Sequence, residues 1–348
     1  MRILFALISV AASSSVDLPN WLAEFPDEMK ISSIPILPGS HNSGTAKTRM
    51  SFGIHQIARQ QHLSIRQQLE SGIRMIDLRV RYDTTPVSGF LFGSRATIRV
   101  AHTLDTSYSF EQSLAEIKSF LDDHPTEFVV ILLRGDWPPE FSFSAEPTKR
   151  ARVAELANVL KASGLTFADN VGIESNIGQV RGQALLVSQW FQYEAATDSN
   201  VDITTSEEEV IPYVNWRTSY QVCDIWDDNF NEKISLKIDR FMRSTQTVNV
   251  GELEHATDSQ EIQPRICSAL PGSLLFTGVA LDRTHGFIIP PGLTSNFWTA
   301  WFVNELETNE SWRPAMSPPV PVGVVLLDFA DAHFVERLIQ VGLTMARQ

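Results

Sequence analysis

The chain has 348 residues, of which 43% are hydrophobic and 20% are charged, so its composition is that of an ordinary globular protein. At this length an α/β barrel can form one domain from the whole chain, although a prior of about 150 residues per domain suggests two. The formal net charge of −13 argues against nucleic acid as a partner and against attachment to a membrane surface by charge alone.

The N-terminus has the order of a secretory signal peptide. One arginine precedes an apolar run over residues 3–12, and small residues follow. We therefore expect a signal peptide over residues 1–16, a secreted protein, and one domain over residues 17–348. The alternative is a buried N-terminal segment of a cytoplasmic protein. Cys223 and Cys267 are expected to be buried thiols, or to pair once if the chain is secreted.

Short apolar runs alternate with helical patterns along the chain. The runs predict strands over residues 33–37, 74–80, 97–102, 128–134, 184–188, 221–226, 273–281 and 322–329. The helical patterns cover residues 64–72, 109–125, 149–164 and 331–346. Continuous Val, Ile and Leu runs are typical of parallel strands buried on both faces. The alternation predicts an α/β fold, a single irregular (β/α) TIM-type barrel.

Polar side chains stand at the ends of these predicted strands. The C-terminal ends of barrel strands meet at the active-site face, so these side chains are expected to converge. They are His41, Asp77, Arg79, His102, Arg134, Asp136, Asp224, Trp226 and Asp328. Each also has a structural interpretation: His41 as a turn residue, Arg134 with Asp136 as a surface pair, and Asp328 as the cap of the last helix.

Two histidines with an arginine suit phosphodiester chemistry. One neutral imidazole removes a proton from an attacking hydroxyl, and the other, as imidazolium, protonates the leaving oxygen. The arginine stabilises the charge that grows on the phosphoryl oxygens. A metal site formed by His41, His102 and Asp77 is the weaker alternative, because Arg79 lies two residues from Asp77 on the same strand face and would compete with a bound cation.

These residues stand in motifs that resemble a known family. The motifs are "LPGSHNSGT" at residues 37–45, "GIRMIDLRVR" at 72–81, "VAHTL" at 100–104 and "FVVILLRGDW" at 128–137. Together they resemble the X domain of phosphatidylinositol-specific phospholipases C, in particular the bacterial-type single-domain enzymes and their fungal relatives. The resemblance is closest over residues 31–137 and continues in order to Asp328.

The resemblance implies a role for each matched residue. His41 would be the general base, His102 the general acid, and Asp328 the carboxylate that orients the base. Asp77 and Arg79 would form a D-x-R pair in which the arginine stands in place of calcium, so that no metal and no other cofactor is expected. Four residues would lie at the inositol site: Arg134, Asp136, Asp224 and Trp226.

The sequence departs from the bacterial pattern at two places. Asn42 stands where those enzymes usually carry an aspartate that supports the acid histidine, so weaker support of His102 is expected. Ser188 and Gln189 stand where they carry a Lys-Arg pair, which leaves the headgroup open. The resemblance implies a monomer that acts on a phospholipid at a membrane surface. The alternatives are another phosphodiester lipid, a glycosyl-inositol phospholipid, and a catalytically silent barrel that binds phospholipid.

Overall fold

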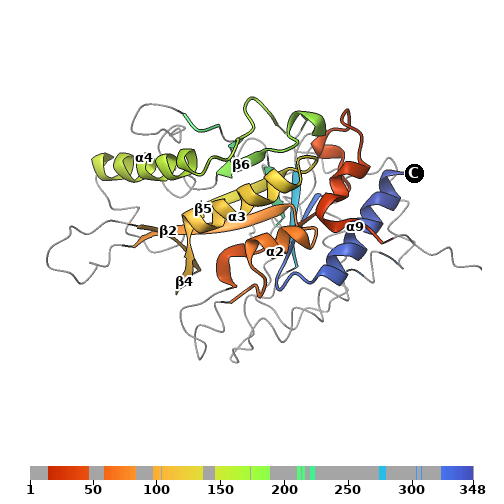
Figure 1. Cartoon of the computed structure of the whole chain (residues 1–348), viewed down its shortest axis with the longest axis horizontal. Helices are drawn as coiled ribbons and strands as arrows, with labels where there is room; N and C mark the ends of the chain where they lie inside the picture. Colours follow the sequence, from red (N-terminus) through yellow and green to blue (C-terminus); the bar gives the residue numbers. More distant parts are fainter. Residues whose placement is uncertain are drawn as a thin grey trace, which may run out of the picture.

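A computed structural model gives the fold of the chain (Figure 1). It describes residues 15–46, 59–83, 97–102, 104–135, 146–172, 174–188, 210–212, 214–215, 220–223, 274–279 and 323–347, with residues 303 and 307. The helices are α2 (Ile65–Glu70), α3 (Phe110–Asp123), α4 (Glu146–Ala162) and α9 (Ala332–Ala346), and the short 3₁₀ helices are η1 (Leu18–Glu24), η2 (Ile31–Ser33), η3 (Ser43–Thr45) and η4 (Ile177–Gln179).

The strands form one sheet with the strand order of a barrel. They are β1 (Ile36–Ser40), β2 (Met75–Asp83), β3 (Thr97–His102), β4 (Leu104–Ser109), β5 (Val129–Gly135), β6 (Ala184–Ser188), β7 (Val214–Asn215), β8 (Tyr220–Cys223), β9 (Leu274–Val279) and β10 (Gly323–Leu327). The path runs β7-β6-β5-β2-β1-β10-β9-β8, with every neighbouring pair parallel. The two strands at the ends of this path, β7 and β8, are successive in the chain. The last strand of the chain, β10, pairs with its first strand, β1. This is the order of an irregular TIM-type barrel.

One predicted barrel strand has a different place. The segment over residues 97–102 forms β3, which pairs antiparallel with the second half of β2 and then with β4. The prediction of a parallel strand there was wrong, because a short apolar run does not reveal the direction of its partner. The result is a hairpin that extends β2 beyond the rim of the barrel.

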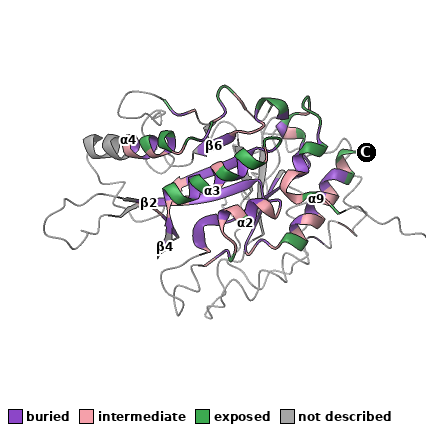
Figure 2. Ribbon diagram, in the orientation of Figure 1, coloured by how far each residue is buried: buried purple, intermediate pink, exposed green. Residues whose placement is uncertain are grey.

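The helices begin where the sequence places capping residues. Ser64 and Ser109 each accept a hydrogen bond from the backbone N–H three residues on, and the glutamine there bonds back to the serine's own N–H, so α2 and α3 both start with a capping box. The predicted apolar stripe of α3 is buried against the strands, while its opposite side is exposed (Figure 2). Asp331 caps α9 by accepting from the N–H of His333.

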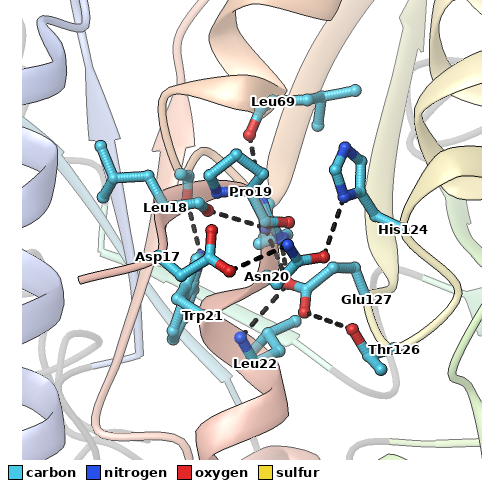
Figure 3. A network of polar contacts seen from close by, with 12 residues as sticks. Asp17, Leu18, Pro19, Asn20, Trp21, Leu22, Leu69, His124, Thr126 and Glu127 are labelled. Atoms are coloured by element: carbon cyan, nitrogen blue, oxygen red, sulfur yellow. Dashed lines mark hydrogen bonds and ion pairs between the residues drawn. The ribbon is translucent and has the colours of Figure 1, made fainter.

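A buried ion pair closes the end of the sheet where the parallel strands begin. Arg74 precedes β2, Glu127 precedes β5, and a nitrogen of Arg74 lies 2.7 Å from Oε2 of Glu127, with neither side chain exposed. Arg74 also donates to the carbonyls of Leu18 and Pro19. Figure 3 shows the N–H of Leu22 donating to Glu127. This network fastens η1 to the barrel.

Some sequence predictions concern residues outside this description. They include most of the predicted signal peptide (residues 1–14), Cys267 and the ends of the strands predicted over residues 221–226 and 273–281. Among the helices that are described, none is both long and apolar enough to cross a membrane.

Candidate active site

His41 and Asp328 form a buried pair at the ends of adjacent parallel strands. Ser40, the last residue of β1, is in register with Leu327, the last residue of β10. The residues that follow them, His41 and Asp328, are therefore brought side by side. Nδ1 of His41 lies 2.8 Å from Oδ1 of Asp328, and the two residues are 3% and 2% exposed. In the tautomer whose Nδ1–H donates to this carboxylate, the lone pair of the imidazole is on Nε2. The interpretation of Asp328 as a helix cap was wrong, because Asp331 caps α9.

Two donors approach Nε2 of His41. The side-chain amide nitrogen of Asn42 lies 2.9 Å away, and a terminal nitrogen of Arg79 lies 3.2 Å away. Oδ1 of Asn42 is buried and makes no hydrogen bond to any described residue. Asn42 was expected beside His102; its amide contacts the other histidine, and the side chain of His102 lies outside the described part of the chain.

The residue after each member of the pair has a left-handed backbone. Asn42 follows His41 with φ 47°, and Phe329 follows Asp328 with φ 48°. Asparagine adopts this conformation more readily than other residues with a side chain, whereas for a bulky residue such as phenylalanine it is a strained exception. Such strain persists where surrounding contacts impose it, and it clusters at functional sites.

Asp77 and Arg79 lie on the same face of β2, as alternation along a strand requires. Oδ2 of Asp77 accepts from the backbone N–H of Asn42 at 3.1 Å, and Oδ1 lies 3.3 Å from Nε of Arg134 on β5. Burial raises the pKa of the Asp77 carboxyl, but the charges of Arg134 and Arg79 and the hydrogen bond from the backbone N–H of Asn42 outweigh it. The net result is a pKa below the ordinary value of 3.8. The buried Asp77 carboxylate is therefore favoured in its ionised form, next to Arg134 and to the loop that follows His41.

The small residues of the loop at residues 40–45 pack within the protein. Oγ of Ser43 donates to the carbonyl of Ser40 and accepts from the N–H of Asp77. A Cβ at Gly44 would lie 2.3 Å from Cγ1 of Val100 on β3, so only glycine fits there. Close packing inside the protein thus gives one reason for the small residues of this loop.

His102 returns to the rim on the hairpin. Val80 of β2 is in register with Val100 of β3, and the pairing is antiparallel. His102 is the last residue of β3 and follows Val100, the last position at which β3 pairs with β2, by two residues. The prediction that His102 ends a strand is confirmed, although that strand is not part of the barrel, and its place at the site stays a prediction.

Two buried glutamines near this pair were not singled out from the sequence. Gln60 is 3% exposed and Gln61 is fully buried. Gln61 contacts the ends of β1 and β10, and Gln60 contacts Asp328, which follows β10. No apolar periodicity and no known motif marks residues 59–63, so nothing in the sequence points to them.

The structure does not describe the remaining candidate site residues. Asp136, Asp224, Trp226 and Gln189 lie outside the described residues, as does the side chain of Ser188. Within the described ranges, no three His, Cys, Asp or Glu side chains are grouped as a metal site would require.

Comparisons with known proteins point to one group of enzymes. No protein-family model matches the chain. The curated "1-phosphatidylinositol phosphodiesterase" of Listeria monocytogenes is 26% identical over 179 residues, which is 51% of this chain and 50% of that protein. The human "PI-PLC X domain-containing protein 1" is 32% identical over 74 residues, 21% of each chain. The chain thus matches half or less of the length of these curated relatives.

Solved structures share the fold over nearly the whole chain. A phosphatidylinositol-specific phospholipase C from Listeria monocytogenes has a TM-score of 0.63 at 15% identity, over 94% of this chain and 99% of that one. One from Staphylococcus aureus has a TM-score of 0.62 at 16% identity, over 93% and 97%. These likenesses confirm the predicted TIM-type barrel.

Proposed function

The chain is related in sequence and in fold to the phosphatidylinositol-specific phospholipases C with an X domain, and from this premise we propose that it is a phosphodiesterase acting on a phosphatidylinositol-type phospholipid. The products would be diacylglycerol and an inositol cyclic phosphate. The observation that carries the proposal is the buried His41–Asp328 pair with Arg79 3.2 Å from Nε2 of His41.

The proposed reaction is an intramolecular transfer. Nε2 of His41 takes the proton of the inositol 2-hydroxyl while that oxygen attacks phosphorus, and the P–O bond to glycerol breaks. His102 gives a proton to the leaving glycerol oxygen, so that protons balance between the two imidazoles. Asp328 keeps the proton of His41 on Nδ1 and stabilises the imidazolium that forms.

Arg79 supplies the positive charge in this proposal. A phosphoryl group that reacts next to Nε2 of His41 lies within reach of the Arg79 guanidinium, which can bind two oxygens at once. Asp77, which lies on the same face of β2 as Arg79, forms an ion pair with Arg134. We therefore propose that the reaction needs no calcium and no other cofactor.

The finer assignments follow the resemblance. Arg134, Asp136, Asp224 and Trp226 would hold the inositol ring. The protein would act as a secreted monomer at a membrane surface, with a single catalytic domain over residues 17–348.

The test is product analysis with defined vesicles. Purified protein is incubated with phosphatidylinositol vesicles, with and without a chelator, and phosphorus NMR of the aqueous phase distinguishes cyclic from monoester phosphate. Vesicles of phosphatidylcholine and of a glycosyl-inositol phospholipid test the headgroup, and His41→Ala is the matched inactive control. We expect cyclic phosphate from phosphatidylinositol only. Cleavage of all three lipids, or of none, would contradict the proposal.

A further inference from the structure

Gln61 ties the ends of β1 and β10 together. Its amide nitrogen donates to the carbonyl of His41 and to the carbonyl of Leu327, each at 2.8 Å, and its Oε1 accepts from the N–H of Ala330 at 3.1 Å. These contacts use both amide hydrogens and the carbonyl oxygen in a fully buried site. One side chain therefore fixes the backbone on both sides of the His41–Asp328 pair.

Gln60 contacts the carboxylate itself. In the amide orientation that satisfies its neighbours, its nitrogen donates to both carboxylate oxygens of Asp328, at 3.0 Å each. Its backbone carbonyl accepts from the N–H of Phe329 at 2.7 Å, and its own N–H donates to Oγ1 of Thr45 at 3.0 Å. Gln60 thus joins the loop after His41 to the strained turn after Asp328.

From these contacts we propose that Gln60 and Gln61 are positioning residues for the His41–Asp328 pair. Gln60 holds the carboxylate in the rotamer that faces Nδ1 of His41, and Gln61 holds the two backbones at the spacing that this hydrogen bond needs. Neither glutamine contacts Nε2 of His41, so neither touches the reacting atoms. Their effect on turnover rests on the proposed function, whereas their effect on the geometry of the pair does not.

The chemical reason is that His41 can act as the proposed base only when Asp328 keeps its ring in the correct orientation. A hydrogen bond to a buried carboxylate is stronger than one between neutral groups, and it fixes the oxygens that would otherwise rotate. If Asp328 rotates away, His41 loses both its orientation and the charge that stabilises its protonated form. Removal of the Gln60 amide should therefore lower turnover without weakening substrate binding.

The kinetic test uses Gln60→Met, which keeps the length of the side chain but has no donor, and Gln60→Glu, which sets a second carboxyl group against Asp328. We expect kcat of Gln60→Met to fall by about 10- to 100-fold, the range for a hydrogen bond to a charged group, with KM changed by less than about threefold. Gln60→Glu should fall at least as far. Gln183→Met is the matched control, since its amide donates to Gln179 at the other end of the sheet.

A proton NMR measurement on the free protein separates the two proposals. The Nδ1–H proton of His41, bonded to Asp328, should give a downfield resonance that is absent in His41→Ala. We expect this resonance to broaden or move upfield in Gln60→Met and to stay unchanged in Gln183→Met. An unchanged resonance in both Gln60 variants would overturn the positioning role, as would a kcat within about twofold of the parent in an active enzyme. An inactive parent with an altered resonance would reject the proposed function and keep the positioning role.

Discussion

The amide nitrogen of Asn42 lies 2.9 Å from Nε2 of His41, the atom that would accept the substrate's proton. In the free protein Nε2 of His41 is therefore already bonded to a donor, which the hydroxyl of the proposed substrate would have to displace. The buried Oδ1 of the same amide, which bonds to no described residue, is available to a hydroxyl that enters. Asn42 thus contacts the nitrogen of His41 at which the proposed reaction would begin.

Asn42→Asp is expected to move the acid limb of the pH–rate profile to higher pH. A carboxylate next to His41 favours the imidazolium, which cannot act as a base, so a higher pH is needed for the same activity. The measurement is kcat/KM against pH for both proteins at matched salt. Superimposable acid limbs would contradict the contact with His41. A shift confined to the alkaline limb would instead support the placement beside His102 that the sequence predicts.

His41→Ala and His102→Ala should each lower kcat by at least about 100-fold, the usual scale for the loss of a general acid or base. Circular dichroism and the melting temperature check that each variant is folded. His333→Ala is a matched control, because this histidine is exposed on α9. Near-normal turnover in a folded variant at either position would reject the two-histidine mechanism.

Arg79→Lys should lower kcat by at least about tenfold, because an ammonium cannot reproduce the planar contact of a guanidinium with two phosphoryl oxygens. The parent enzyme should keep its activity in a chelator. Both are measured on phosphatidylinositol vesicles. Loss of activity in the chelator with recovery on added calcium would show that Arg79 does not replace the metal.

Asp77→Asn should reduce stability at neutral pH and much less in acid. The pKa of Asp77 is lowered in the folded protein, so its contribution to stability is present above its unfolded value, near 3.8, and is lost as the pH falls further below it. The difference in melting temperature between the parent and the variant should therefore be constant above about pH 5 and shrink between about pH 5 and pH 2. A difference that is constant over this range would show that the ionised form is not favoured by folding.

Arg74→Met should destabilise the protein by about 3–5 kcal/mol, because it leaves the Glu127 carboxylate buried without its partner. Chemical denaturation measures this loss. The double variant Arg74→Met with Glu127→Met removes both charges and should recover part of it. Since the pair lies at the end of the sheet opposite His41, the folded fraction of each variant should keep its turnover.

The sequence predicts those parts of this structure that depend on local patterns. The runs at β5, β6 and β10 are buried because they are continuous Val, Ile and Leu segments, and the serine caps of α2 and α3 follow from their own first turn. The pairing of His41 with Asp328 follows from the barrel rule that strand ends converge and from the resemblance.

The direction of β3 and the roles of Gln60 and Asn42 depend on contacts between distant segments. A run of six residues fits a parallel strand and a hairpin strand equally well, so its partner decides. Gln60 contacts Asp328 across 268 positions of the chain, the difference between 328 and 60. The direction of the Asn42 side chain depends on a left-handed backbone that the motif alone does not specify.

The contact between Gly44 and Val100 has a mechanical consequence for the two histidines. There is no space for even a methyl group between the loop that follows His41 and the strand that carries His102. A densely packed protein interior is hardly compressible, so a displacement of one segment is transmitted to the other. If the loop shifts when a lipid headgroup enters, β3 has to shift with it. His41 and His102 would then move together, and their separation would stay constant while the opening around them changes.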